Sequence, residues 1–447
     1  MQPWTTIEKS QAMDKHPELD SMVVTDEQSQ LVESHQHLRE EVLLEHATFY
    51  EKLHNLTYAT FLMIGVAFLW PWNCFLSASL YFQHDVFHDD TVYANIYTST
   101  MMSISTISSV IFNVWLSKRQ HSYTKRIVRG LVWESMVFTT LCVLVLTHHI
   151  LPQWFTFFLL MFMVLISSLG TAMTQNGTMA MANIFGKEFS QAVMVGQAIA
   201  GVLPSLALFG VSFVGDPTDQ STGSIFAYFF MTTAVSVGTI IMYRMSSIED
   251  KGTTGFIVSE ESESQVHVPF MTLFSKLKYL VLSIFTTFVV TLVFPVFAAN
   301  TFVSGLPLHN SQYIPLIFTM WNLGDLYGRV ISDYQIFQSD SFTPFKTFIY
   351  SLARIAFVPL FFCFNIKNTS NTSHKTLSDI CYIFLQFAFG VTNGNVISVS
   401  FMKVGSQLDT DVERKAAGGF TNVFLSTGLA LGSVISYLFV YLISQYK

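Results

Sequence analysis

An aspartate and an arginine stand four residues apart in a stretch that otherwise has the character of a membrane span, Asp325 and Arg329 in residues 321–329. On a helix this spacing places both side chains on one face, one turn apart. A charge at the centre of a bilayer costs about 2.5–3.5 kcal/mol on insertion scales, so such residues usually face a protein interior or a water-filled cavity. The pair therefore predicts a polar site on a permeation pathway.

A second candidate region lies in the first apolar run, where Pro71 is followed by Trp72 and Asn73. A proline inside a membrane helix frees a backbone carbonyl and bends the chain. The tryptophan offers a flat aromatic face, and the asparagine offers a hydrogen-bond donor and an acceptor. Stacking combined with amide hydrogen bonds suits a planar heterocycle such as a nucleobase. The alternative is a packing kink beside an interfacial tryptophan.

Further polar residues interrupt other apolar runs. Thr174–Thr178 contains three neutral hydrogen-bonding side chain types, and residues 390–395 place amides beside glycines. Neutral polar residues in membrane helices either join helices or line a cavity, and small residues permit close helix approach. Glu134 and Arg354 are isolated charges inside apolar runs, and each of them needs a partner that the sequence alone does not identify.

Several classes of chemistry lack their sequence signatures. The chain has no HExxH motif, no phosphate-binding glycine loop and no continuous basic patch of the kind that nucleic acids require. Its four cysteines have no paired spacing and lie in or beside apolar runs, which favours packing over disulfides or zinc ligation. We therefore expect no enzyme activity, no metal, no cofactor and no nucleic-acid partner.

The composition indicates a membrane protein with many spans. Of 447 residues, 51% are hydrophobic and 12% are charged, whereas soluble domains carry about 25% charged residues. Apolar runs of about 20 residues are long enough to cross a bilayer core. Eleven such runs lie near 57–82, 92–116, 127–151, 154–185, 189–214, 224–244, 277–302, 311–337, 347–366, 377–402 and 416–443.

These runs predict an all-α integral membrane protein of eleven transmembrane helices in a 6+5 arrangement. The expected parts are an acidic cytosolic tail (1–53), a six-helix bundle (54–244), a cytosolic linker (245–276) and a five-helix bundle (277–447). Basic residues are concentrated in alternate loops, which places the N-terminus in the cytosol and the C-terminus in a lumen or outside the cell. Two sequons, at Asn368 and Asn371, fall on the non-cytosolic side and are candidate glycosylation sites.

Several of these motifs, in this order, resemble the equilibrative nucleoside transporter family. The likeness is carried by residues 71–73, Gln175, Gly196 followed by Gln197, the Asp325–Arg329 pair and residues 393–394. The eleven apolar runs and the large middle loop agree with it. It covers about 55–447 and is greatest for the fungal intracellular branch. The resemblance implies a fold related to the major facilitator architecture, and it favours a vacuolar or lysosome-like membrane over the plasma membrane.

The resemblance also implies roles for individual residues. Asp325 and Arg329 would lie near the ribose hydroxyls, and Gln175 would form a hydrogen bond with the base. Gly196 would correspond to a glycine that the family needs for transport, and Asn73 is expected, like Gly196, to have a transport or packing role. The substrate-binding set that it implies is Leu69, Trp72, Leu76, Gln175, Phe318, Asn322, Asp325 and Arg329. Two departures stand out: a leucine occupies position 76, where some relatives have methionine, and Asn176 follows Gln175, which would make the base pocket more polar.

The expected function is facilitative transport of purine and pyrimidine nucleosides by alternating access, with nucleobases as further candidate substrates. Two alternatives remain open at this stage. One is a proton-coupled exporter of an acidic organelle, in which Asp325 or Glu134 takes up protons. The other is a sensor that binds nucleosides without moving them.

Overall fold

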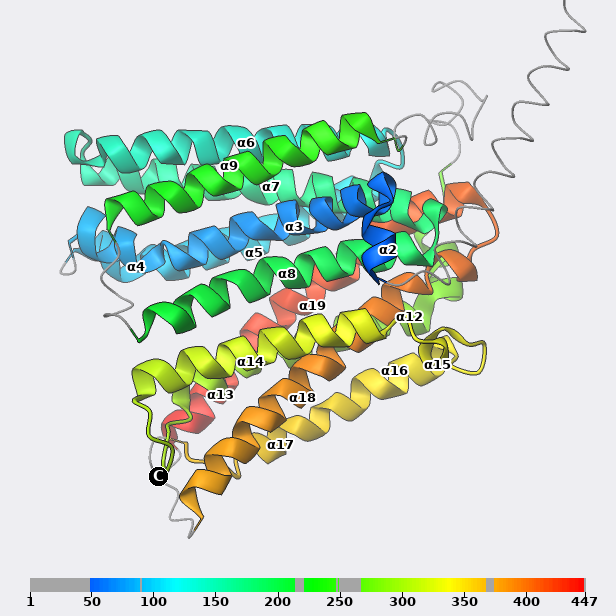
Figure 1. The fold of residues 1–447 in the computed structure, drawn as a ribbon. Helices are drawn as coiled ribbons and strands as arrows, with labels where there is room; N and C mark the ends of the chain where they lie inside the picture. The colour runs from blue at the N-terminus through cyan, green and yellow to red at the C-terminus, as the bar shows by residue number, and fades with distance from the viewer. Residues whose placement is uncertain are drawn as a thin grey trace, which may run out of the picture. The chain divides into compact units, whose positions relative to one another are not determined.

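Each of the eleven apolar runs coincides with a helix or with a closely spaced series of helices in the computed structural model (Figure 1). The structure describes residues 49–88, 91–213, 221–246, 248, 267–366 and 374–445. Nearly all of the expected acidic tail, most of the 245–276 linker and the sequons at Asn368 and Asn371 lie outside the described residues.

The helices before the middle loop begin with the short α2. Their bounds are α2 (Phe49–Leu53), α3 (Leu56–Ser77), α4 (Ser79–Tyr81), the π-helical turn η1 (Phe82–Val86), α5 (Val92–Lys118), α6 (Tyr123–Thr147), the 3₁₀ turn η2 (His148–Ile150), α7 (Gln153–Phe185), α8 (Lys187–Val211) and α9 (Thr222–Met245).

The helices after the middle loop include one broken span. Their bounds are α12 (Phe270–Thr291), α13 (Phe294–Asn300), α14 (Asn310–Ile331), α15 (Gln335–Gln338), α16 (Pro344–Ala353), the 3₁₀ turn η3 (Arg354–Ala356), α17 (Phe357–Phe361), α18 (Lys375–Met402), the 3₁₀ turn η4 (Gly405–Gln407) and α19 (Asp411–Gln445).

Nine helical segments among the described residues are long and apolar enough to cross a membrane. The two remaining expected spans are α14, in which charged and amide side chains interrupt the apolar run, and the series α16–η3–α17, whose helices are individually short. The expectation of a helical, multi-pass membrane protein is confirmed. A total of eleven spans is consistent with this arrangement.

Local sequence signals determine where several of these helices begin. Asn55, Thr91, Ser221 and Thr343 each accept a backbone N–H bond from the first turn of the helix that follows, which satisfies a donor that the helix itself leaves unpaired. Gly186 lies between α7 and α8 with φ of 121°, a backbone conformation that residues other than glycine rarely adopt. The sharp turn at Gly186 therefore separates two long apolar helices.

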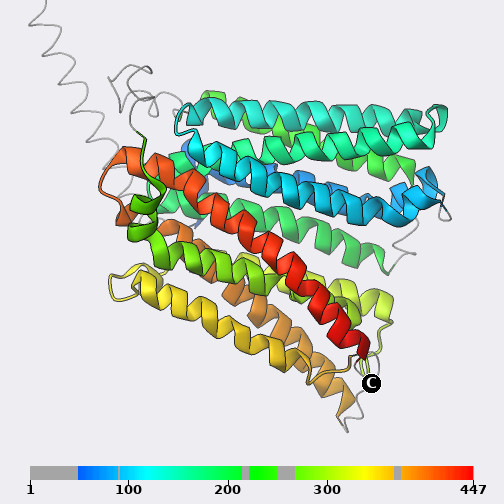
Figure 2. The same ribbon diagram turned by 180° about the vertical axis from the view of Figure 1, so that it is seen from behind.

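The helices pack within residues 53–447, which form one compact unit. Helix α3 packs on α8, α9 and α7, and α6 packs on α7 and α9. After the middle loop, α14 packs on α18, and α12 packs on α19, α16 and α18. Helix α8 contacts α14 and α18, while α19 contacts α5 and α7, so these four contacts join the two sets of helices (Figure 2).

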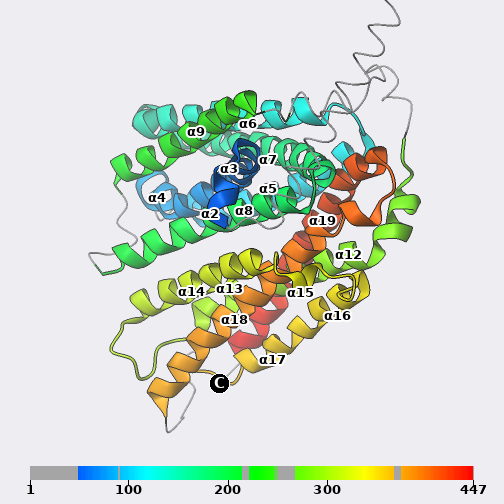
Figure 3. The same ribbon diagram turned by 45° about the vertical axis from the view of Figure 1, so that its right-hand side comes forward.

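Four glycines allow α14 and α18 to approach each other at backbone distance (Figure 3). A Cβ on Gly324 or Gly328 would overlap the carbonyl oxygen of a residue in α18, and one on Gly390 or Gly394 would overlap a carbonyl oxygen in α14. Each helix therefore carries a GxxxG pair that fits against the other, the small-residue pattern of close membrane helix contacts.

The contact between α3 and α8 has the same character. A Cβ on Gly196 would overlap the carbonyl oxygen of Leu62, and one on Gly65 would overlap that of Val193. Gly196, which the sequence associates with transport, is thus a point of backbone contact between two helices of the first set.

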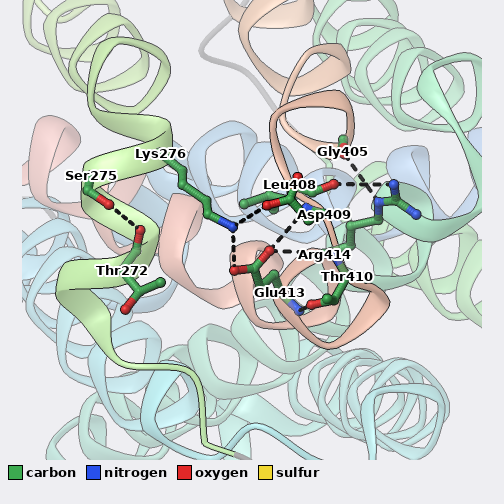
Figure 4. A network of polar contacts seen from close by, with 9 residues as sticks. All are labelled: Thr272, Ser275, Lys276, Gly405, Leu408, Asp409, Thr410, Glu413 and Arg414. Atoms are coloured by element: carbon green, nitrogen blue, oxygen red, sulfur yellow. Dashed lines mark hydrogen bonds and ion pairs between the residues drawn. The ribbon is translucent and has the colours of Figure 1, made fainter.

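The loop before α19 is held by a charged network at the end of the helices where α12 begins (Figure 4). The Lys276 ammonium donates to Asp409 Oδ2 at 2.7 Å and to Glu413 Oε1 at 2.6 Å. The hydrogen bond from Lys276 holds the pKa of Asp409 below its usual value. The first turn of α19 contacts α7, because Asn183 Nδ2 donates to the Arg414 carbonyl at 3.1 Å.

We expect Gly394→Ala to lower the thermal unfolding midpoint of the purified protein, because the added methyl group would push α14 away from α18. Overpacking of this kind costs about 1–3 kcal/mol. The matched control is Gly238→Ala in α9, where a Cβ would meet nothing within 4 Å. An equal effect of the two substitutions on the midpoint would contradict the close contact.

We expect Lys276→Met to lower the unfolding midpoint more than Lys278→Met, an exposed lysine two residues further along α12.

Because the folded-state pKa of Asp409 is depressed, its contribution to stability is complete above the unfolded pKa of about 3.9 and is lost as the pH falls through the lower folded value. The Asp409 contribution should therefore be the same at pH 7 and pH 5, which thermal unfolding of Asp409→Asn and the parent at both pH values would check.

Candidate functional site

The pair of charges on α14 forms a direct ion pair inside the protein. Arg329 Nε donates to Asp325 Oδ2 at 2.8 Å, and the two residues are 6% and 4% exposed. The other carboxylate oxygen, Oδ1, accepts from Asn393 Nδ2 at 2.6 Å. Asn393 lies on α18 between Gly390 and Gly394, so the glycine contact between α14 and α18 is what brings this amide to the carboxylate.

The arginine of the pair also reaches the first set of helices. Arg329 Nη1 donates to the carbonyl oxygen of Met194 on α8 at 2.7 Å. One turn away, Gln191 Nε2 donates to the carbonyl oxygens of Arg329 and Val330 at 3.4 and 3.2 Å. The ion pair therefore lies on a contact between the two sets of helices. Any change in that contact must change the surroundings of Arg329.

Two amide side chains, Asn73 of the first expected span and Asn322 of the eighth, contact adjacent residues of α8. Asn73 Nδ2 donates to the Ala200 carbonyl at 2.8 Å. A Cβ on the next residue, Gly201, would lie 2.7 Å from Asn322 Oδ1. The amide of Asn322 is itself oriented by a bond from its Nδ2 to the Phe318 carbonyl at 2.9 Å. Adjacent residues of α8 thus separate Asn73 from Asn322.

Four of the remaining expected site residues differ in burial and depth. Leu69, Trp72 and Leu76 are partly exposed on α3, while Gln175 on α7 is 8% exposed. Thr171 Oγ1 lies 3.4 Å from the Phe68 carbonyl, which sets the two antiparallel helices side by side. Trp72 and Gln175 each lie one turn beyond that contact in opposite directions, about 12 Å apart along the helix axes at 1.5 Å per residue.

Phe318 belongs to an aromatic cluster. Its ring lies 5.1 Å from that of Phe294, which in turn stacks on Trp321 at 4.7 Å. The ring of Phe318 is partly exposed, so it combines packing with an accessible face.

Asn176 has a different environment from the one that the sequence suggests. Its Oδ1 accepts a 2.6 Å bond from Arg126 Nη1, and the residue is fully buried. Arg126 also donates to the Leu116 and Arg119 carbonyls at the end of α5, where a cation complements the helix dipole. The expected gain in pocket polarity at Asn176 is wrong, because this amide joins α6 to α7.

A second buried carboxylate lies within the first set of helices. Glu134 on α6 is 0% exposed, and its two oxygens accept from Ser167 Oγ and Thr171 Oγ1 on α7, each at 2.8 Å. Both partners are neutral hydroxyls. Thr171 also lies beside the Phe68 carbonyl, so Glu134 is one residue removed from the part of α3 that precedes Pro71.

A separate groove of about 950 Å³ lies between α5 and α7. It is lined by serines and large apolar residues such as Ile107, Phe158 and Phe162. None of the expected site residues lines it. Within the described residues, no group of three or more His, Cys, Asp and Glu side chains is placed to hold a metal ion.

The sequence did not predict three contributors to the network around Asp325 and Arg329: Asn393, which binds Asp325, Met194, which binds Arg329, and Thr291, which binds Asn393. Asn393 had a signal, since it is an amide between two glycines of a helical GxxxG pair. Met194 binds Arg329 mainly through its backbone oxygen at 2.7 Å, which any residue type could supply, and its sulfur lies 3.9 Å from the same nitrogen. Thr291, which donates to Asn393 Oδ1 at 2.5 Å, is one threonine among many in an apolar run.

The sequence matches a family model described as nucleoside transporter over residues 160–254 and 246–441. The chain is 52% identical to the nucleoside transporter FUN26 of Saccharomyces cerevisiae, over 88% of this chain and 86% of that protein. It is 24% identical to the human equilibrative nucleoside transporter 1, over 86% of this chain and 97% of that protein.

Two solved structures share the arrangement of helices. One is XylE, a proton:xylose symporter of the major facilitator superfamily, with a TM-score of 0.61, 11% identity and coverage of 87% of this chain and 88% of that one. The other is a bacterial homologue of the iron transporter ferroportin in an outward-facing state, with a TM-score of 0.58, 13% identity and coverage of 87% and 94%. At these identities the likeness concerns the fold alone.

Proposed function

Since the chain belongs to the equilibrative nucleoside transporter family, we propose that it carries nucleosides across a membrane by facilitated diffusion. The observation that supports this most directly is the buried Asp325–Arg329 pair on the contact between α8 and α14. Charged residues inside a membrane protein are costly, and those that occur usually mark a substrate or ion pathway. Here the pair joins the two sets of helices that alternating access would move.

We assign the sugar to the α14 end of the site. An ionised carboxylate has about four acceptor positions, and Asp325 uses two of them for Arg329 and Asn393. The remaining positions can accept ribose hydroxyls once the contact with α8 loosens. Arg329 orients the carboxylate, and hydrogen bonds to an ionised acceptor are the stronger ones.

We assign the base to α3 and α7. The partly exposed Trp72 offers its face for stacking, with Leu69 and Leu76 one turn to either side, and Gln175 offers an amide. Because Trp72 and Gln175 are about two helical turns apart in depth, the base would contact one of them first and reach the other as the helices rearrange. Nucleobases, which lack the sugar, would depend on this part of the site alone.

Alternating access would act on the same contacts. Arg329 donates to Met194 on α8, and Gln191 on α8 donates to the Arg329 carbonyl. These bonds join the two sets of helices near the start of α8, and the basic loops predict that this end of α8 is cytosolic. The six-plus-five division at the middle loop remains our proposal for the moving parts. The N-terminus would be cytosolic and the C-terminus luminal, with a vacuolar or lysosome-like membrane favoured by the likeness to the fungal intracellular branch.

One observation favours a second candidate, proton-coupled nucleoside export. A carboxylate that is fully buried and whose side-chain partners are neutral hydroxyls, as Glu134 is, is costly to keep ionised. Such a group could exchange a proton during transport. We favour the equilibrative mechanism, because a Glu134 that remains protonated satisfies its two hydroxyl partners without any exchange.

We expect Asp325→Ala to abolish uridine and adenosine uptake into proteoliposomes, because the substitution removes the acceptor for the sugar and leaves Arg329 without its partner. Asp340→Ala, at an exposed loop position, is the matched control and should retain uptake. Monodispersity and the unfolding midpoint would show that both variants fold. Near-normal uptake by a folded Asp325→Ala protein would overturn the assignment.

We expect Glu134→Gln to retain uridine uptake at pH 5 and pH 7, because the neutral amide can replace a protonated carboxyl group in its bonds to Ser167 and Thr171. Glu134→Leu removes the acceptor that both hydroxyls share and should lower uptake or stability. The proton-coupled mechanism predicts something different: uptake by the parent protein that an inward proton gradient drives above equilibrium, and loss of that drive in Glu134→Gln.

A further inference from the structure

Arg354 is a fully buried arginine that the proposed nucleoside site does not yet explain. It is 1% exposed and lies at the break between α16 and α17. Pro359, four residues beyond Ile355, lacks the N–H that would continue an α-helical ladder to that residue, which accounts for the 3₁₀ turn that starts at Arg354. Discontinuous helices in transporters are often found near binding sites.

The guanidinium of Arg354 binds neutral groups on two neighbouring helices. Nη1 donates to the Thr287 carbonyl at 3.2 Å and Nη2 to Thr291 Oγ1 at 3.4 Å, both on α12. Nε donates to Thr392 Oγ1 on α18 at 3.3 Å, and the cation lies 4.7 Å from the centre of the Phe389 ring.

The bond to Thr291 determines where that hydroxyl proton points. Thr291 Oγ1 lies 2.6 Å from the Thr287 carbonyl and 2.5 Å from Asn393 Oδ1, yet a hydroxyl has one proton to donate. Arg354 already donates to the Thr287 carbonyl and occupies a lone pair of the Thr291 oxygen. Both contacts favour donation from Thr291 to Asn393.

The amide of Asn393 transmits this orientation to the ion pair. With Oδ1 accepting from Thr291, its Nδ2 faces Asp325 Oδ1 and donates to it at 2.6 Å. An amide turned the other way would place its oxygen against the carboxylate, which repels it. Asp325 is thereby held with Oδ2 toward Arg329, whose Nη1 reaches α8.

We propose that Arg354 is a positioning residue for the nucleoside site, which acts through Thr291 and Asn393 to hold the Asp325 carboxylate in the orientation that receives the sugar hydroxyls. This inference rests on the proposed function. It assigns to the broken span a role in sugar recognition, although Arg354 itself does not touch the substrate.

Two isosteric substitutions separate this role from a merely structural one. Thr291 and Thr392 both accept a hydrogen bond from Arg354, but only Thr291 continues to Asn393. Thr291→Val therefore interrupts the relay, while Thr392→Val removes a bond to Arg354 and leaves the relay intact. Each variant is compared with Arg354→Gln and with the double variant Arg354→Gln/Thr291→Val.

The measurement is Vmax/KM in proteoliposomes for uridine and for 2′,3′-dideoxyuridine, which lacks the 2′ and 3′ hydroxyls and keeps the 5′ hydroxyl. We expect Arg354→Gln and Thr291→Val each to reduce the preference for uridine about tenfold or more, the size of one lost hydrogen bond to a charged group. The loss should appear as a raised KM for uridine. Thr392→Val should keep the parental preference, and the double variant should be no worse than Arg354→Gln, since two steps in series are not additive.

Equal losses for the two substrates, additive losses in the double variant, a parental preference in Thr291→Val or a loss in Thr392→Val equal to that in Thr291→Val would each overturn the inference. In all four of these outcomes the parent protein still moves uridine, so the proposed function survives. If the parent protein neither binds nor moves uridine, the proposed function fails, and the inference fails with it.

Discussion

The close contact between α14 and α18 is the constraint on which the site depends. Gly324 and Gly328 on one helix and Gly390 and Gly394 on the other leave no room for a Cβ, so the two backbones touch. At that separation the short side chains of Asp325 and Asn393 can bond directly. In a membrane interior there is little hydrophobic gain from helix association, and close packing with interhelical hydrogen bonds takes its place. The glycines thus supply both the contact and the polar network that it encloses.

The same contact explains how a charged pair can be stable inside the protein and still be available for transport. Asp325 is compensated by Arg329 and by a neutral amide on α18, while Arg329 extends to a backbone oxygen on α8. A buried pair loses most when a single partner is removed. Here the partners of Asp325 stay within the second set of helices, and the bonds that cross to the first set involve Arg329 and its neighbour Val330, through Met194 and Gln191. A rearrangement between the sets could therefore break those crossing bonds while the carboxylate remains paired.

Much of the fold was predictable because it depends on local patterns, and part of the site was not because it depends on long-range contacts. Length and hydropathy located the long helices, though not the short α2 at Phe49–Leu53, and the i, i+4 spacing indicated that Asp325 and Arg329 share a face. Asn176 shows the limit: a polar residue next to Gln175 looked like a pocket residue, yet its side chain bonds Arg126 on the neighbouring helix. Consecutive residues of a helix point about 100° apart, so an adjacent position is a poor guide to a shared cavity.

The same limit applies to the isolated charges, and it distinguishes them physically. Glu134 has two hydroxyl partners on one adjacent helix, an arrangement that a protonated carboxyl group satisfies without a counter-ion. Arg354 cannot lose its proton in a protein, so its charge must be balanced at a distance, and the relay through Thr291 and Asn393 leads to Asp325. Asp325 therefore lies between two guanidinium groups, one bonded directly and one through the relay. Asp325 thus has a cationic neighbour through each of its oxygens, whereas Glu134 is held by hydroxyl groups, and Glu134 is the position at which proton exchange should be tested.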